Sequence, residues 1–198
     1  LLDEMPTGRK KVITEITPPL QRENVYKKIR EELESGRQVY IICPRINDPD
    51  PDKEMALQAK SVQSESERLK KTVFREYNIG VVHSKMKPKE KDDIMIKFKN
   101  KEIDILVATS VVEVGVNVPN ATVIIIEGAE RFGLSQLHQL RGRVIRSNHQ
   151  AYCYLFAESQ GEKTKDRLRA LIEAKNGFEL AELDLKLRGS GELLGSRQ

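Results

Sequence analysis

The sequence predicts an α/β fold, with a parallel sheet covered by helices on both faces and a helical hairpin in the C-terminal part. Short apolar runs rich in Val and Ile alternate with segments of helical periodicity, which is typical of a parallel sheet buried on both sides. From about Gly161 the pattern changes to two helical stretches separated by Asn176-Gly177, a typical helix stop. The hairpin is therefore an addition to the sheet.

Five strands are expected, each a run of five or six mostly apolar residues. They are Gln38 to Cys43, Ile79 to His83, Ile103 to Ala108, Thr122 to Ile126 and Ala151 to Phe156. Apolar residues at helical spacing lie between them, and these predict three helices: Val25 to Leu33, Met55 to Val73, and a shorter one after Pro88. Further helices are expected at Lys163 to Ala174 and Phe178 to Leu187. The order of elements is a βαβ series.

Composition excludes several classes of protein. Of the 198 residues, 38% are hydrophobic and 32% charged, and no run approaches the roughly 18 apolar residues that a membrane span needs. Cys43 and Cys153 each lie in an apolar run, so we expect buried thiols, no disulfide, no metal-ligand spacing and a cytoplasmic location. A net charge of +4 favours nucleic acid only weakly. The first residues lack a signal-peptide core, and the chain is interpreted as part of a longer protein.

A stripe of polar residues is the strongest functional signal. In a helix over residues 131–146, Gln139, Arg143 and Arg146 would share one face. Leu134, Leu137, Leu140 and Val144 would form the opposite, apolar face. Arginine keeps its charge and binds phosphate with two parallel hydrogen bonds, so the stripe predicts a phosphate site, although a solvated helix face is the alternative. Gly142 favours close approach of a backbone or ligand there.

Two segments that follow strands carry further polar candidates. Ligands of open α/β sheets bind beyond the carboxyl ends of the strands, where the residues after Ala108 would lie. The candidates there are Thr109, Ser110, Glu113, Gly115 and Asn117. Ser84 and Lys85 follow another strand at the same edge and could contact a backbone phosphate. The alternatives are a helix cap for the hydroxyls and a solvated lysine.

Together these segments resemble the second RecA-like domain, of the P-loop NTPase type, of superfamily 2 helicases. Thr109 to Pro119 resembles motif V of that family, and Gln139 to Arg146 resembles motif VI. The phrases Glu130 to Arg143, Asn176 to Glu182 and Leu187 to Gly195 narrow the resemblance to RecG-type helicases. It covers nearly the whole chain.

The resemblance implies a role for each candidate. Arg143 and Arg146 match arginine fingers that reach the phosphates of ATP, and Gln139 matches the motif VI glutamine. Gly115, Asn117 and Glu113 match the part of motif V near the nucleotide. The residues that would contact DNA or couple it to the nucleotide are Ser84, Lys85, Thr109, Ser110, Arg188 and Gln198, the last two in a translocation motif.

The resemblance also implies partners and domain limits. Residues 1–18 would be a linker from a first motor domain, 19–160 the second RecA-like domain, and 161–198 the hairpin and translocation motif. RecG-type proteins use ATP and Mg²⁺ to remodel stalled replication forks and branch-migrate Holliday junctions. The chain has no G-x-x-x-x-G-K-[ST] loop, so ATP and Mg²⁺ would be bound mainly by the first domain. An N-terminal wedge domain would recognise branched DNA, and this chain alone should not hydrolyse ATP.

Two departures from the family pattern leave alternatives open. Ile145 stands where a second Gly is usual, and its β-branched side chain is bulkier and stiffer. Asn117 replaces the usual Asp. Both changes support the alternative of a nucleic-acid or nucleotide binding module without turnover. The other alternative is the equivalent module of a transcription-repair coupling factor, which shares the translocase domain and the hairpin.

Overall fold

The fold is described by a computed structural model for residues 11–109, 117–144, 148–159, 161–174 and 177–195. From residue 188 onward only the backbone is described. The strands are β1 (Ile13–Thr17), β2 (Gln38–Ile42), β3 (Ile79–Val82), β4 (Ile105–Ala108), β5 (Ala121–Glu127) and β6 (Tyr152–Phe156). The helices are α1 (Arg22–Glu34), α2 (Pro51–Thr72), α3 (Pro88–Lys99), α4 (Leu134–Arg141), α5 (Glu162–Glu173) and α6 (Gly177–Gly195). Short 3₁₀ turns span Pro19–Gln21, Ala129–Arg131 and Gly142–Val144.

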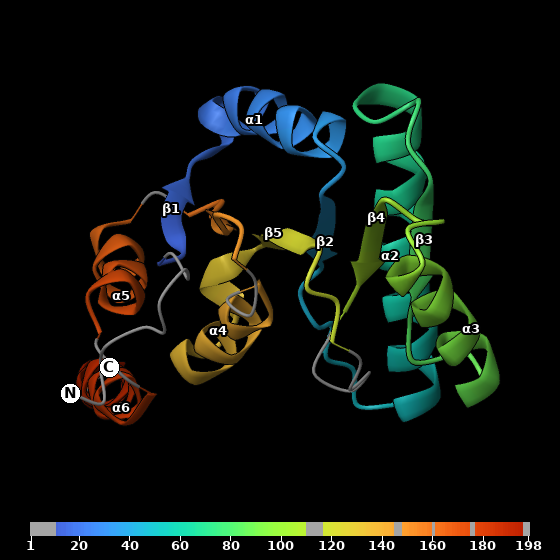
Figure 1. The fold of residues 1–198 in the computed structure, drawn as a ribbon. Helices are drawn as coiled ribbons and strands as arrows, with labels where there is room; N and C mark the ends of the chain where they lie inside the picture. Colours follow the sequence, from blue (N-terminus) through green and yellow to red (C-terminus); the bar gives the residue numbers. More distant parts are fainter. Residues whose placement is uncertain (1–10, 110–116, 145–147, 160, 175–176, 196–198) are drawn as a thin grey trace.

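The six strands form one parallel sheet in the order β1-β6-β5-β2-β4-β3 (Figure 1). Each strand-helix-strand connection returns the chain to the amino edge before the next strand begins. The carboxyl ends of all six strands therefore lie along the same edge. This confirms the predicted α/β class with a parallel sheet.

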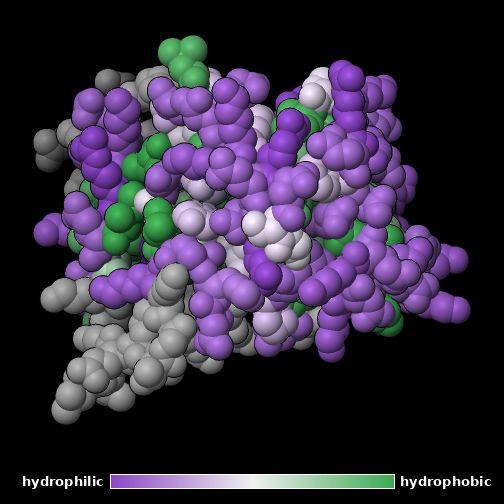
Figure 2. All heavy atoms as spheres, turned by 45° about the horizontal axis from the view of Figure 1, so that its top comes forward, coloured by the Kyte–Doolittle hydropathy of each residue, from purple (hydrophilic) through white to green (hydrophobic). Residues whose placement is uncertain are grey.

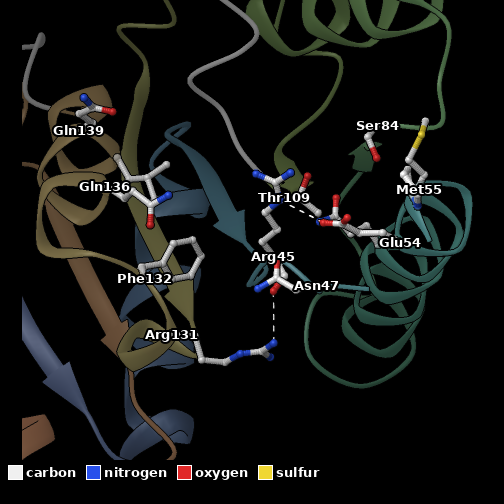
Figure 3. Close-up of a pocket in the computed structure, with 13 residues that line it drawn as sticks. Arg45, Asn47, Glu54, Met55, Ser84, Thr109, Arg131, Phe132, Gln136 and Gln139 are labelled. Atoms are coloured by element: carbon white, nitrogen blue, oxygen red, sulfur yellow. Dashed lines mark hydrogen bonds and ion pairs between the residues drawn. The ribbon is translucent and has the colours of Figure 1, made fainter. Parts of the chain in front are cut away.

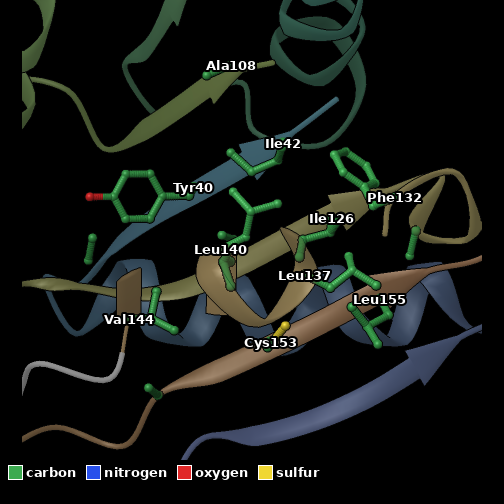
Figure 4. Close-up of a cluster of buried hydrophobic side chains, with 14 of the residues drawn as sticks. Tyr40, Ile42, Ala108, Ile126, Phe132, Leu137, Leu140, Val144, Cys153 and Leu155 are labelled. Carbon is green, nitrogen blue, oxygen red and sulfur yellow. The ribbon is translucent and has the colours of Figure 1, made fainter. Parts of the chain in front are cut away.

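Alternate side chains of the sheet pack against different helices. One buried cluster joins β2, β4, β5 and β6 to α3, α4, α5 and α6, and includes Tyr40, Ile126 and Leu155 (Figure 4). A second cluster on the other face joins the sheet to α1 and α2. The central strands are buried on both faces, which explains why their sequences are continuous apolar runs.

The N-terminal strand β1 was not expected. Residues 1–18 were interpreted as a linker, but residues 13–17 pair in parallel with β6 at the edge of the sheet. The sequence Ile13-Thr-Glu-Ile-Thr17 is short and half polar because one side of this edge strand is partly exposed. The role of the residues before Ile13 as a linker from another domain stays a prediction.

Two helix boundaries also differ from the expectation. A single helix through Arg146 was wrong, because α4 ends at Arg141 and a 3₁₀ turn follows at Gly142–Val144. Glycine is a poor helix former, and helix ends commonly tighten in this way. A β-carbon at Gly142 would meet no heavy atom within 4 Å among the described residues, so no backbone packs closely there. In the hairpin, α6 continues to Gly195, well beyond the expected end at Leu187.

Both cysteines are buried and free, as expected. Burial raises the pKa of the Cys153 thiol to about 12. The face in Figure 2 is mostly hydrophilic, with small separated hydrophobic areas. Within the described ranges, none of the helices combines the length and the apolar character required for a membrane span.

The packing of α4 on the sheet should dominate the stability of this half of the domain. Leu137 is fully buried between α4 and the sheet (Figure 4). We expect Leu137→Ala to lower the free energy of unfolding by about 2 to 5 kcal/mol, through lost burial and the remaining cavity. Chemical denaturation measures this loss. The matched control is Ser135→Ala on the exposed face of the same helix, and an equal loss in both variants would contradict the assignment.

Candidate functional site

A cleft of about 670 Å³ opens at the carboxyl edge of the sheet (Figure 3). Its walls come from the loops that follow β2, β3, β4 and β5, from the first two turns of α2 and from α4. The lining residues are Arg45, Asn47, Pro51, Glu54, Met55, Gln58, Ser84, Thr109, Arg131, Phe132, Gln136, Gln139 and Leu140. The cleft therefore combines two arginines with several amides and hydroxyls, which are the donors that contact nucleic-acid backbones.

Polar contacts fix the shape of this cleft. Arg45 Nε lies 3.4 Å from Glu54 Oε1, and Arg131 Nη2 donates to the backbone oxygen of Arg45 at 3.2 Å (Figure 3). The loop before Arg131 turns at Gly128, whose φ of 55° is left-handed. Ser84 Oγ is buried and has no hydrogen-bond partner among the described residues. Ser84 therefore has bonding capacity left for a ligand.

The structure brings three of the predicted site residues together. Ser84 after β3, Thr109 after β4 and Gln139 on α4 all line the cleft. Lys85 is separate, because it lines a groove beside β3 together with His83 and Glu90. Asn117 is exposed and precedes β5, at the opposite edge of the sheet. Ser110, Glu113, Gly115, Arg146 and Gln198 lie outside the described residues, as does the side chain of Arg188.

Arg143 lies in the 3₁₀ turn after α4, half buried, and is not among the residues that line the cleft. Burial raises the pKa of Tyr40 in β2 to about 12, and the nearby Arg143 charge opposes part of that rise. Arg143 therefore lies near Tyr40, and Gln139 lines the cleft whereas Arg143 does not.

The hairpin helices α5 and α6 make polar contacts with the start of α4. Asp184 on α6 accepts a hydrogen bond from the first backbone N–H of α4, Leu134 N, at 3.2 Å. A carboxylate is favourable at a helix N-terminus, where the backbone N–H groups are otherwise unpaired. Arg167 on α5 lies 3.3 Å from Asp184 and donates to the backbone oxygens of Glu130, at 3.1 Å, and Phe132. The two hairpin helices therefore fix the start of α4.

The other end of α4 is fixed as well. Arg141 Nη1 donates to the backbone oxygen of Leu171 on α5 at 2.9 Å. Burial lowers the pKa of this arginine. A β-carbon added at Gly177 would lie at an ordinary contact distance of 3.5 Å from the His138 ring, so the start of α6 lies beside α4. Both ends of α4 are therefore in contact with the hairpin helices.

Sequence reasoning missed Arg131, Arg167 and Asp184. Arg167 and Asp184 are 17 residues apart on two helices, and their shared target is a loop more than thirty residues upstream of Arg167. No periodicity connects such positions. The one available signal was a charged residue next to the buried stripe Leu168, Ala170 and Leu171 of α5, which is too common to decide a role.

Two partly buried carboxyl groups, Glu127 at the end of β5 and Glu65 on α2, lie on the α1 and α2 face of the sheet. Burial and the Glu65 carboxylate raise the pKa of Glu127, at the end of β5, to about 8, while Arg68 and Arg22 oppose the rise. Cys43 Sγ lies 3.7 Å from Glu127 Oε2, and Arg68 donates to Glu65 and to the hydroxyl of Tyr26. A carboxyl group beside another carboxylate is harder to ionise, because the two negative charges would repel each other.

The six-stranded parallel sheet, with its cleft at the carboxyl edge, is the RecA-like class of α/β domain. The helicase conserved C-terminal domain matches residues 22–148. The chain belongs to this family of helicase C-terminal domains.

Relatives extend the similarity over the whole chain. It is 49% identical to the ATP-dependent DNA helicase RecG of Aquifex aeolicus and 45% identical to that of Synechocystis, covering 25% and 23% of those proteins. A solved structure of RecG bound to a three-way DNA junction matches 96% of this chain and 24% of its own, with 43% identity and a TM-score of 0.76. The resemblance to RecG-type helicases is confirmed, and the chain spans about a quarter of the length of these relatives.

The carboxyl pair makes the stability of this domain depend on pH. The folded state raises the pKa of Glu127 above its ordinary value of 4.5, so its contribution is complete below that pH and is lost as pH rises toward about 8. Glu127→Gln mimics the protonated form, and we expect it to flatten the fall in melting temperature from about pH 5 to about pH 9. Glu23→Gln, at an exposed position of α1, should keep the original slope. An unchanged slope in Glu127→Gln would contradict the raised pKa of Glu127.

Proposed function

We propose that this chain is the C-terminal motor half of an ATP-dependent double-stranded DNA translocase that remodels stalled replication forks and branch-migrates Holliday junctions. The relatives named RecG support the activity, and the solved RecG bound to a three-way junction supports branched DNA as the partner. In the longer protein, the first RecA-like domain would bind most of the ATP, and the N-terminal wedge domain would recognise branched DNA. The observation that best supports the proposal is that both ends of α4 are hydrogen-bonded to the hairpin helices.

That attachment explains how turnover could become movement. Closure of two motor domains around a nucleotide would displace the turn that carries Arg143 and the helix before it. Asp184 and Arg167 hold the start of α4, and Arg141 holds its end. Because both ends are fixed to α5 and α6, the displacement passes to the hairpin as a rigid-body shift. A hairpin that contacts duplex DNA would then push it.

The residues of this chain fit one side of an ATP site. Arg143 is half buried and carries a guanidinium suited to phosphate oxygens. No cluster of three His, Cys, Asp or Glu side chains able to hold a metal ion occurs in the described ranges. Bound ATP with Mg²⁺ supplies the energy of phosphoryl transfer, and Arg143 would stabilise charge on the transferring group. The first domain would hold most of the nucleotide.

The cleft fits a nucleic-acid strand. Ser84 and Thr109 offer hydroxyls, and Arg45 and Arg131 offer positive charge. The hydrogen bond from Arg131 to the backbone oxygen of Arg45 joins the loops that carry the two arginines. Such donors read phosphate and sugar and carry no base specificity. A motor that moves along any sequence needs this kind of contact.

The first experiment measures ATP hydrolysis by the full-length protein without DNA, with linear duplex and with a model replication fork, at matched salt because phosphate contacts are salt-sensitive. We expect the strongest stimulation by the fork. Hydrolysis that is absent under every condition would contradict the motor and favour a binding module.

Arg143→Ala in the full-length protein should lower ATP turnover by roughly 10³ to 10⁵-fold if it acts as an arginine finger, with fork binding nearly unchanged. Arg143→Lys, which keeps the charge but loses the planar fork, should recover only part of the activity. Steady-state ATPase and fluorescence anisotropy measure the two properties. Unchanged ATPase in Arg143→Ala would rule out the finger.

Arg167→Gln should separate hydrolysis from movement, because it removes the ion pair with Asp184 and the bonds to the loop before α4. We expect fork-stimulated ATPase to persist while the number of base pairs unwound per ATP falls at least about tenfold. Arg169→Gln, at a more exposed position of the same helix, is the matched control. Equal losses of ATPase and unwinding in Arg167→Gln would indicate misfolding. The same assay applies to Arg188→Ala, the coupling residue that the resemblance implies.

A further inference from the structure

The cleft contains a single acidic side chain among its lining residues in the described part of the chain, Glu54. It faces Arg45, one of two cations there, with Nε and Oε1 3.4 Å apart (Figure 3). The Glu54 side chain is 20% exposed, whereas that of Arg45 is 74% exposed. A carboxylate opposes phosphate binding, so its presence in a cleft of this kind needs an explanation.

Glu54 cannot easily turn away from the cleft. It belongs to the first turn of α2, which begins at Pro51 and is capped by the Asp50 side chain, 3.0 Å from Asp52 N. The backbone N–H of Glu54 is bonded to Asp50 O at 2.9 Å. The backbone of Glu54 is therefore fixed and its side chain is only 20% exposed, while the long, more exposed side chain of Arg45 can change partners.

The backbone of Arg45 is fixed independently. Arg131 donates to the backbone oxygen of Arg45, and Gln58 Nε2 donates to that of Ile46 at 3.3 Å. These two bonds hold the loop after β2 whichever partner the Arg45 guanidinium has. Exchange of partners is thus a side-chain event that leaves the loop in position.

We propose that Glu54 competes with nucleic-acid phosphate for Arg45 and so limits how tightly the cleft holds a strand. The inference rests on the proposed function, because it takes the strand-binding role of the cleft as given. A phosphate that arrives beside Ser84 and Thr109 takes over the Arg45 guanidinium, since exposed ion pairs are weak and arginine binds phosphate with two parallel bonds. When the phosphate leaves, Glu54 recovers Arg45. A motor that must release its track at every step benefits from such a competitor.

Glu54→Gln in the full-length protein tests the proposal. Glutamine keeps the size and can still accept a hydrogen bond from Arg45, but it brings no repulsion to phosphate. We expect about three- to tenfold tighter binding of a fluorescein-labelled model fork at low salt, and slower unwinding. The gain should shrink as salt rises, because screening weakens the charge that was removed. Asp52→Asn removes one charge from the same turn outside the cleft lining and should change binding less than twofold.

A double-mutant cycle shows whether Glu54 acts through Arg45. Arg45→Gln alone should weaken fork binding, and the gain from Glu54→Gln should be largely lost in the Arg45→Gln background. An equal gain in both backgrounds would overturn the competition, because it would mean general repulsion. Unchanged binding in Glu54→Gln, with a preserved melting temperature, would overturn it too.

Fork binding by other cleft variants distinguishes a failure of the proposed function from a failure of the competition by Glu54. If Ser84→Ala, Arg45→Gln and Arg131→Gln all bind the fork as the unchanged protein does, the cleft does not hold nucleic acid. If they weaken binding while Glu54→Gln has no effect, the cleft holds the strand and Glu54 is only a partner that keeps Arg45 in place.

Discussion

The parallel direction of all six strands is the constraint on which the other features depend. It forces every crossover to return along a face of the sheet, and it gathers every carboxyl end at one edge. Loops after β2, β3, β4 and β5 therefore meet there although they are far apart in the sequence. The cleft formed by Arg45, Ser84, Thr109 and Arg131 is a consequence of this topology.

The two faces of the sheet carry different chemistry. On the face covered by α1 and α2, burial and the Glu65 carboxylate raise the pKa of Glu127, which lies near Arg68 and the buried Cys43 thiol. On the other face, α4 rests on apolar side chains and ends in the turn with Arg143. Gly128 and the short turn after it connect the carboxyl pair to the cleft, since Arg131 follows within three residues. The cleft and the turn with Arg143 are thus separate candidate sites on one sheet.

The hairpin is joined to the sheet through α4. The apolar contacts of Leu168, Leu171 and Leu180 supply the burial, while Asp184, Arg167 and Arg141 determine the geometry. Buried polar contacts are specific because an unpaired buried charge is costly, whereas apolar contacts tolerate sliding.

The sequence by itself determined the α/β class, five of the six strands, the buried stripe of α4 and the presence of the hairpin, because burial on one or both faces leaves a periodic apolar pattern. It also identified Ser84, Thr109 and Gln139, which the structure brings together, through their places after strands and on a helix face. The edge strand β1 escaped because its half-exposed residues are mixed in polarity. Only the tertiary structure decided that α4 ends before Arg143, that Lys85 lies outside the cleft, and that Arg167 and Asp184 meet at the start of α4. Those facts depend on contacts between distant segments, and such contacts leave no local pattern in the chain.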